Sequence, residues 1–329
     1  MTTTNVLIVG AAGQTGASIT NSLLEFPTEF EITALLRPAS ADKPENVALK
    51  ERGVKLAPAD LQGPQDELIK LLSGIDVVIS AIGPTAQLDQ IPLATAAKAA
   101  GVKRFIPCGF ITVAPPKGVM WLRDQKEDVY NHIRELSLPY TIIDVGWWFQ
   151  VAVPRVPSGR VDYAVMNPDA NAIIGDGDQL SGLTDLRDVG RYVARIIVDP
   201  RTLNKMVFAY NELLTQDKIF KLMGELSGEK IERTYLPAAE IHSRVDTARK
   251  AMKEGSTDAL DKLMLYTSEY CLSWGLRGDN TPEYAKFLGY VTSKELYPDF
   301  NGVRFEDYLR EVLEGKAKRV YPDLKFPKS

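Results

Sequence analysis

Short apolar runs alternate with amphipathic stretches through the first half of the chain. Apolar runs rich in β-branched residues predict strands, and apolar positions that recur every three or four residues predict helices. Strands are predicted at 6–9, 31–36, 54–57, 76–80, 105–107 and 140–145, and helices between them at 19–24, 47–52, 67–72, 91–100 and 119–136. Continuous apolar strands separated by helices are typical of a parallel sheet covered on both faces. We therefore predict an α/β fold built on a doubly wound parallel Rossmann sheet.

The pattern loosens after Gly146, where prolines and glycines indicate loops. A helix at 188–198 and a strand at 205–210 are predicted to return to the sheet, and helical segments dominate from residue 215. We predict a first domain over residues 1–150, with returning segments at about 184–212. The remainder, 151–183 and 213–329, is predicted to form a smaller, mostly helical domain.

Three glycines stand at the first strand-helix junction. The sequence Gly10-Ala-Ala-Gly13-Gln14-Thr15-Gly16 follows the first strand directly, a Gly-x-x-Gly-x-x-Gly variant of the dinucleotide fingerprint. Gly10 permits the tight turn, Gly13 lets the backbone approach a pyrophosphate, and Gly16 permits close packing of helix on strand. The helix N-terminus offers N–H groups and a positive dipole end to phosphates. This segment predicts a dinucleotide site; the alternative is a glycine-rich turn without a ligand.

The end of the second strand distinguishes between the two nicotinamide cofactors. NAD sites carry an acid there, which accepts a hydrogen bond from the ribose 2′-hydroxyl. This strand ends in Arg37, whose guanidinium can bind a 2′-phosphate, and Lys43 in the next loop adds a second positive charge. We therefore predict that the first domain binds NADPH, the alternative being that Arg37 is an ordinary solvated surface residue.

Further cofactor contacts follow from the rule that ligands bind at the carboxyl ends of parallel strands. Cys108 follows the fifth strand and is expected near the nicotinamide, although a small buried hydrophobic residue is the simpler interpretation. The other residues assigned to the cofactor are Asp60, after the third strand, and Ser80, Ala81, Ile82 and Gly83, after the fourth.

A lysine interrupts the apolar stripe of the helix at 119–136. Leu122, Val129, Ile133 and Leu136 lie on one helical face, and Lys126 fills the gap four residues after Leu122. Such a lysine either extends its ammonium to water or has a buried purpose, and burial disfavours the charged form, which suits proton transfer. The off-stripe residues predicted to face solvent are Arg123, Asp124, Glu127, Asp128 and Asn131.

These features together resemble the NmrA-like atypical short-chain dehydrogenases, above all the isoflavone, pinoresinol-lariciresinol and phenylcoumaran benzylic ether reductase branch. The more specific similarities are the lysine before the Leu-Pro-Tyr-Thr strand at 138–141 and the tail motif at 295–309. The resemblance runs along nearly the whole chain. It implies a Rossmann domain that binds NADPH, a C-terminal substrate domain, and a general acid/base role for Lys126 beside the nicotinamide.

The chain departs from the plant reductases in two segments. Those enzymes usually read Pro-Ser-Glu-Phe-Gly after the fifth strand, whereas this chain reads Pro107-Cys-Gly-Phe110 and lacks the acid. After residue 145 it reads Gly-Trp-Trp-Phe in place of a segment with Asn and Phe. We therefore do not carry over the plant substrates themselves. The candidate substrate-pocket residues are Phe110, Trp147, Trp148 and Phe149, and the three adjacent aromatics are as often core packing.

Composition argues against several other classes of protein. The 329 residues carry a formal net charge of −4, which argues against electrostatic binding of nucleic acid or an anionic membrane. Two cysteines are too few for a disulfide scaffold, and two histidines leave little for a metal site or a catalytic triad. No signal peptide or membrane span is evident, so we expect a soluble, cytoplasmic protein without a metal, and leave a homodimer open.

The resulting hypothesis is an NADPH-dependent reductase of an aromatic, phenylpropanoid- or isoflavonoid-like small molecule. Hydride is expected to reach an electrophilic carbon made reactive by conjugation, with Lys126 as general acid or base. Two alternatives stay open. One is a non-catalytic NmrA-like regulator that senses the redox state of NADP(H); the other is a quinone reductase that uses the same site on simpler acceptors.

Overall fold

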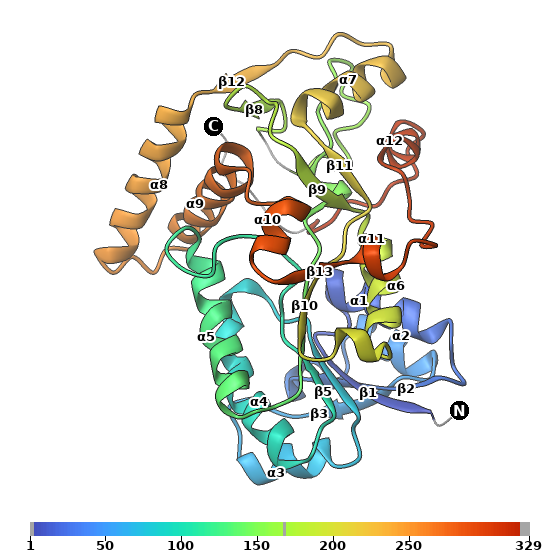
Figure 1. The fold of residues 1–329 in the computed structure, drawn as a ribbon. Coiled ribbons are helices and arrows are strands. Elements are labelled where there is room, and N and C mark those ends of the chain that lie inside the picture. The colour runs from blue at the N-terminus through green and yellow to red at the C-terminus, as the bar shows by residue number, and fades with distance from the viewer. Residues whose placement is uncertain (1–2, 167–168, 323–329) are drawn as a thin grey trace. The chain divides into compact units, whose positions relative to one another are not determined.

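The computed structural model describes residues 3–166 and 169–322, and its backbone contacts divide the chain into two compact units (Figure 1). The first unit comprises Met1–Phe110, Gln125–Asp144 and Leu186–Ala209, and the second Ile111–Asp124, Val145–Asp185 and Tyr210–Ser329. The second unit contains more residues than the first, whereas the sequence analysis predicts that it is the smaller domain. The difference arises because the chain leaves the first unit directly after Phe110 and again after Asp144, rather than near residue 150.

The first unit is built on a parallel sheet with strand order β3-β2-β1-β4-β5. Val9 at the end of β1 pairs with Leu35 of β2 and Ser80 of β4, so the loops after these strands begin at one edge of the sheet. An isolated bridge from Phe105 to Tyr140 continues the sheet to β6, Thr141–Asp144, which pairs with β10, Lys205–Phe208. The first five strands are β1 Thr4–Val9, β2 Phe30–Leu36, β3 Lys55–Pro58, β4 Val77–Ser80 and β5 Arg104–Ile106.

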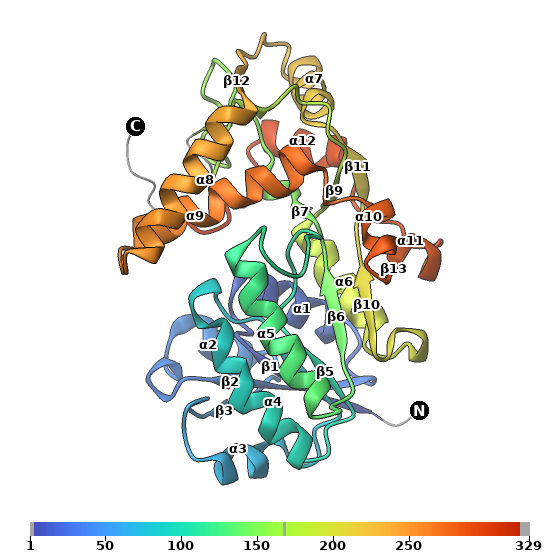
Figure 2. The ribbon, with the colours of Figure 1, turned by 60° about the vertical axis from the view of Figure 1, so that its left-hand side comes forward.

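Helices cover both faces of this sheet, as its continuous apolar strands predict. Leu7 and Val9 pack with α3, α4 and α5, while Val6 and Ile8 alternate to the opposite face. Figure 2 shows α3, α4 and α5 together on one side of the sheet. The helices of the unit are α1 Gln14–Leu24, α2 Pro44–Glu51, α3 Gln65–Leu72, α4 Gln90–Ala99, α5 Trp121–Glu135 and α6 Leu186–Ile196. Every predicted strand and helix is present. The largest difference is α1, which begins at Gln14 rather than near residue 19, because the glycine motif supplies its first turn.

The second unit combines short strands with longer helices around its own core. Phe149, Phe305 and Tyr308 pack together there, with Phe149 edge-on to Phe305 at 4.9 Å between ring centroids. Its strands include β7 Trp147–Trp148, β8 Ala172–Ile174, β9 Ser181–Thr184, β11 Glu212–Leu214, β12 Thr234–Leu236 and β13 Tyr290–Thr292. Its helices include α7 Gln216–Ser227, α8 Ala238–Lys253, α9 Ala259–Tyr270, α10 Pro282–Phe287, α11 Ser293–Leu296 and α12 Phe305–Leu313, and a π-helical segment, Cys271–Arg277, follows α9. Across residues 3–166 and 169–322, no helix has the length and apolarity needed to cross a bilayer.

The contact between α1 and α6 depends on a glycine. The Gly190 amide donates to Ser18 Oγ at 2.9 Å, and Ser18 Oγ donates to the Leu186 carbonyl at 2.5 Å. A Cβ at Gly190 would collide with the Ser18 carbonyl. The two helices therefore approach backbone to backbone.

Gly190→Ala is expected to lower the free energy of unfolding by about 2 kcal/mol, because overpacking a close contact costs about 1–3 kcal/mol. Chemical denaturation followed by circular dichroism measures the change. The matched control is Gly224→Ala in α7, where a Cβ would lie an ordinary 3.4 Å from the Glu229 carbonyl oxygen. Removing a helical glycine there should leave stability equal or higher. Equal stability of the two variants would contradict the role given to Gly190.

Candidate active site

The glycine motif forms a turn with no room for side chains at two of its positions. Gly10 has φ +78°, and a Cβ there would lie 2.5 Å from the Ala81 carbonyl oxygen. A Cβ at Gly16 would collide with the Gly10 carbonyl. Gly13 is exposed and precedes α1 without a side-chain cap, so the first N–H groups of this helix are not covered by a capping side chain. This is the backbone arrangement that a bound pyrophosphate uses.

The loop after β4 lies beside the glycine turn. The Ala81 amide donates to the Val9 carbonyl at 2.9 Å, which joins the two predicted cofactor loops. Ser80 is fully buried, and its Oγ has no partner among the described residues. The partly exposed Gln14 and Thr15 lie in the first turn of α1. The structure therefore brings together the predicted residues that follow β1 and β4.

The predicted 2′-phosphate residues are exposed on the turn after β2. The Ser40 amide donates to the Arg37 carbonyl, and the Lys43 amide donates to the Ser40 carbonyl, so Arg37 and Lys43 occupy consecutive turns. Within the described ranges no carboxylate pairs with Arg37, which leaves its guanidinium available to an anion. Asp60, after β3, is also exposed, and its Oδ1 accepts from the Gln62 amide at 3.0 Å. Over residues 3–166 and 169–322, no hydrogen bond or ion pair joins the Asp60 side chain to the other predicted cofactor residues.

Lys126 lies inside the first unit with only 2% of its surface exposed. Its Nζ donates to Gln87 Oε1 at 3.0 Å, to the Cys108 carbonyl at 2.5 Å and to the Gly109 carbonyl at 3.2 Å. Burying an ammonium is costly unless hydrogen bonds replace its hydration, and these three acceptors do so. Of the two alternatives for this lysine, extension to water is therefore wrong.

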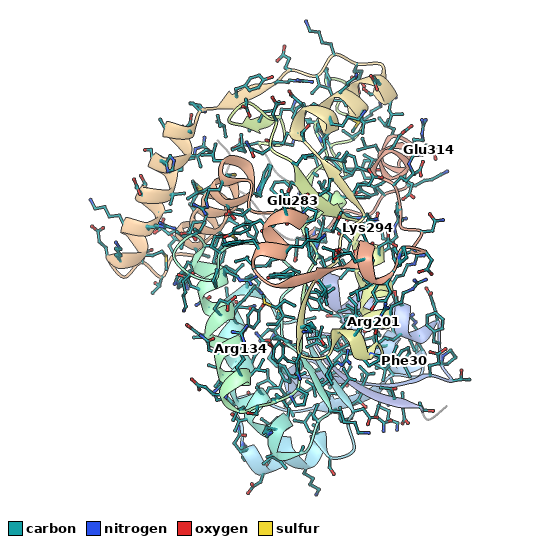
Figure 3. All side chains as sticks on the ribbon, viewed as in Figure 1. Phe30, Arg134, Arg201, Glu283, Lys294 and Glu314 are labelled. Atoms are coloured by element: carbon teal, nitrogen blue, oxygen red, sulfur yellow. The ribbon has the colours of Figure 1, made fainter. Side chains whose placement is uncertain are left out.

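The face of α5 that we predict to be solvated is partly buried. Arg123 is 1% exposed and donates to Tyr290 Oη at 2.8 Å. Glu127 is 5% exposed and lies 3.7 Å from the guanidinium of Arg134, which Figure 3 labels near the end of this helix. Periodicity reveals one apolar face of a helix, and it does not reveal charged side chains whose partners lie elsewhere.

Two buried glutamines complete the surroundings of Lys126, and the sequence analysis does not include them. Gln87 and Gln90 are 2% and 0% exposed. Gln87 Nε2 donates to the Gly83 carbonyl at 2.9 Å, and Gln90 Oε1 accepts from the Cys108 amide at 2.7 Å. A signal was available, since both glutamines immediately follow a loop assigned to the cofactor.

The segment Cys108-Gly109-Phe110 is tightly constrained. Cys108 is buried and its Sγ lies 3.3 Å from the Ile82 carbonyl, next to the β4 loop. A Cβ at Gly109 would lie 2.5 Å from the Ile143 carbonyl oxygen. Phe110 has φ +55°, which is strained for a residue with a side chain, and it is 5% exposed. Its amide donates to the same Ile143 carbonyl at 2.6 Å, which holds this conformation.

The three adjacent aromatic residues predicted for a substrate pocket have different surroundings in the second unit. Phe149 is fully buried against Phe305, so for this residue the core-packing alternative holds and the pocket assignment is corrected. Trp148 stacks on Tyr321 with ring centroids 6.0 Å apart. Trp147 meets Trp274 at 3.9 Å between centroids, and both line a cavity.

That cavity has a volume of about 490 Å³ and lies between β8, β12 and helices α7, α8 and α9. Its lining is mostly aliphatic, with Trp147, Phe220 and Trp274 as the aromatic members. The volume of the cavity and its apolar lining are typical of a site that binds a small organic ligand.

The polar groups of the cavity lining are mostly satisfied within the protein. Gln216 bonds the backbone of β8 at both ends of its amide, Ser181 Oγ accepts from Asn280, and Arg244 pairs with Glu240. Within the described ranges the indole Nε1 of the buried Trp274 has no hydrogen-bond partner. Burial raises the pKa of the Cys271 thiol to about 11, so this lining cysteine stays a neutral thiol. The cavity therefore suits a neutral, largely apolar ligand.

Comparisons with known proteins agree with the resemblance seen in the sequence. The sequence profile of the NmrA-like family matches residues 2–270. The chain is 50% identical over 316 residues to asnovolin J 5′,6′-dehydrogenase of Aspergillus novofumigatus, covering 95% of this chain and 96% of that protein. It is 26% identical to an isoflavone reductase-like protein of Olea europaea, covering 94% of this chain and 99% of that protein.

Among solved structures, the complex of leucoanthocyanidin reductase with NADPH from Vitis vinifera is similar in fold, with a TM-score of 0.78 at 22% identity. The match covers 94% of this chain and 99% of that chain. The predicted fold class and the stated resemblance are thus both confirmed. By its sequence profile, its relatives and its fold, the chain belongs to the NmrA-like family.

Proposed function

We propose that the protein is an NADPH-dependent oxidoreductase that acts on a small, largely apolar molecule, with Lys126 as the proton-transferring group. One observation carries the proposal. A buried ammonium is held by backbone carbonyls of the segment after β5 and by Gln87, which is bonded in turn to the loop after β4. In open parallel sheets these loops border the ligand.

The residues present fit NADPH. At Gly10 and Gly16 a Cβ would meet the protein's own backbone, so these two glycines shape the turn. The exposed Gly13 and the uncapped start of α1 offer N–H donors that would bind a pyrophosphate. Arg37 and Lys43 would hold the 2′-phosphate. At the same sheet edge, Ser80 Oγ is a buried polar group with no partner in the part of the chain that the structure describes. When bound, the reduced cofactor supplies the hydride. A fold relative, leucoanthocyanidin reductase, is known in complex with NADPH.

Lys126 would act by moving one proton at Nζ. Its burial excludes bulk water, and its three acceptors fix the ammonium in one place. Positioned general acids and bases contribute about 10²–10⁴-fold to rate. To donate, Nζ exchanges one of these hydrogen bonds for the reacting atom of the substrate.

The substrate class follows from the second unit and from the relatives. The apolar cavity with Trp147 and Trp274 is the candidate site for the carbon skeleton, and a conjugated electrophilic carbon is the candidate hydride acceptor. Plant relatives such as the isoflavone reductase-like protein favour an aromatic, phenylpropanoid-like substrate. The relative at 50% identity is a dehydrogenase named for asnovolin J, so a substrate related to that compound fits equally well.

The second candidate function is a redox sensor that binds NADP(H) without turnover. The enzyme name carried by the relative at 50% identity favours catalysis. The experiment that separates the two is NADPH oxidation at 340 nm with aromatic enones, benzylic ethers and quinones. Substrate-dependent oxidation supports an enzyme. Tight NADPH binding supports a sensor if the protein neither oxidises NADPH nor, in the reverse reaction, reduces NADP⁺ with any of these compounds.

Lys126→Met is expected to lower kcat by about 10²–10⁴-fold, because the proton-transferring group is lost. NADPH affinity, measured by the fluorescence of the bound cofactor, should change less than twofold. The control is Lys98→Met in α4, an exposed lysine that donates to the Ser137 carbonyl at 2.9 Å. Full turnover by the Lys126 variant would refute the assignment.

Arg37→Asp is expected to raise the dissociation constant of NADPH at least tenfold and to favour NADH, since an acid accepts from a ribose 2′-hydroxyl and repels a phosphate. Titration with both cofactors measures the preference. Arg52→Asp, at the end of α2 where Arg52 bonds Asn21, makes the same change of charge and should alter neither affinity. An unchanged preference in Arg37→Asp would dismiss the 2′-phosphate site.

Leu263→Trp is expected to fill part of the cavity and raise the KM of the organic substrate at least tenfold. NADPH affinity should be unaffected, because cofactor contacts belong to the first unit. Leu203→Trp, at a residue 37% exposed, is the control. A normal KM in the Leu263 variant would remove the cavity from the substrate site.

A further inference from the structure

Lys126 and three other buried residues, Gln87, Gln90 and Cys108, form a closed ring of hydrogen bonds through their side chains and backbone groups. Lys126 Nζ donates to Gln87 Oε1 at 3.0 Å, and the Gln87 carbonyl accepts from Gln90 Nε2 at 2.9 Å. Gln90 Oε1 accepts from the Cys108 amide at 2.7 Å, and the Cys108 carbonyl accepts from Lys126 Nζ at 2.5 Å. The ring joins the 3-10 turn at Pro84–Asp89, the first residue of α4, the segment after β5 and the middle of α5.

Backbone groups fix the direction of every bond in this ring. The Cys108 amide can only donate, so the Gln90 oxygen must face it and Gln90 Nε2 must donate to the Gln87 carbonyl. The Gly83 carbonyl can only accept, so Gln87 Nε2 faces it at 2.9 Å and Gln87 Oε1 faces Lys126. Flipping the side-chain amide of Gln87 or Gln90 by 180° would place its oxygen against another oxygen, or its NH₂ group against another N–H donor.

All the groups that this ring presents to Lys126 are therefore acceptors. The Cys108 and Gly109 carbonyls cannot donate, and Gln87 is prevented from doing so by Gly83. Cys108 Sγ, 3.8 Å from Nζ, has the Ile82 carbonyl at 3.3 Å as the acceptor for its own proton. Gln87 Oε1 has a second donor, Gln90 Nε2, at 3.4 Å, but its contact with Nζ at 3.0 Å is the shorter one. An ammonium can donate to all three oxygens, whereas a neutral amine has two protons and would turn its lone pair toward one of them.

We propose that Gln87 and Gln90 are positioning residues that keep Lys126 as the charged ammonium, so that the resting enzyme is set to donate a proton. The inference rests on the proposed function, and it specifies the direction of proton transfer, from Lys126 to the substrate. In the step, one N–H bond of the ammonium breaks and the substrate gains that proton. The substrate also gains a hydride from the reduced nicotinamide, so that two electrons and two hydrogens add across its double bond. Water returns a proton to the amine afterwards.

The test is a mutant cycle on Gln87, Gln90 and Lys126. Gln87→Met keeps the side-chain length and removes both polar ends, and is expected to lower kcat about tenfold, the effect of one net hydrogen bond. KM and NADPH affinity should change less than twofold. Gln90→Met should act in the same direction, and the double variant should lose little more than Gln87→Met alone, because either change opens the ring.

The decisive comparison uses the Lys126→Met background. If Gln87 acts through the ammonium, Gln87→Met has no further effect on kcat there. If Gln87 only supports the fold, its loss multiplies with that of Lys126→Met, and the proposal is overturned. Gln65→Met is the matched control, since Gln65 also bonds α4, at the Pro92 carbonyl, without touching Lys126. Turnover is measured with chalcone, or with whichever enone or quinone of the panel reacts fastest.

A second readout does not depend on turnover. In ¹⁵N-lysine-labelled protein, the Nζ resonance that disappears in Lys126→Met reports the number of attached protons. We expect an ammonium signal, slow to exchange, near neutral pH in the wild type, and faster exchange in Gln87→Met. A neutral amine in the wild type overturns the proposal even if the protein proves to be an NADPH enzyme. An ammonium signal in a protein without turnover keeps the ring and rejects the proposed function instead.

Discussion

The burial of one ammonium constrains more of the first unit than any other interaction. Removing a charge from water costs several kcal/mol unless polar groups replace the water. For Lys126 the hydrogen-bond acceptors are uncharged oxygens from two segments of the chain, the turn that contains Gln87 and the segment after β5. These two segments and the middle of α5 must therefore hold their positions together, because a shift of either segment would remove at least one acceptor from the charge.

The same requirement accounts for the backbone after β5. The Gly109 carbonyl reaches Nζ at 3.2 Å while its Cα is close enough to the Ile143 carbonyl to exclude a side chain. Phe110 then takes a positive φ, a conformation that costs on the order of 1 kcal/mol or more for a residue with a Cβ. Strain of this kind persists where the surroundings fix it, and here the amide of Phe110 is tied to the carbonyl that also limits Gly109.

Sequence patterns predict those features that depend on local repetition. Strand and helix periodicity predicts the sheet, and the gap in one apolar stripe singles out Lys126, because a helix buries one face along its whole length. The same reasoning fails for Arg123 and Glu127, whose burial depends on partners that periodicity does not contain. It also fails for Phe149, since an aromatic residue in a core and one in a pocket look identical in sequence. The partners of Lys126 lie 17, 18 and 39 residues away, and no local pattern links such distances.

The segment after β5 offers Lys126 backbone carbonyls rather than an acid. Where the plant reductases usually carry Glu, this chain has Gly109, at a position where a side chain would meet both the Ile143 carbonyl and the carboxylate of Asp144. A carboxylate there would also stand beside the ammonium and hold its proton more strongly. The hydrogen bonds that the structure gives to Lys126 Nζ go instead to one amide oxygen and two backbone carbonyls. The position of the ammonium is therefore fixed by groups that cannot exchange a proton with it, and two of the three belong to the backbone of the segment after β5.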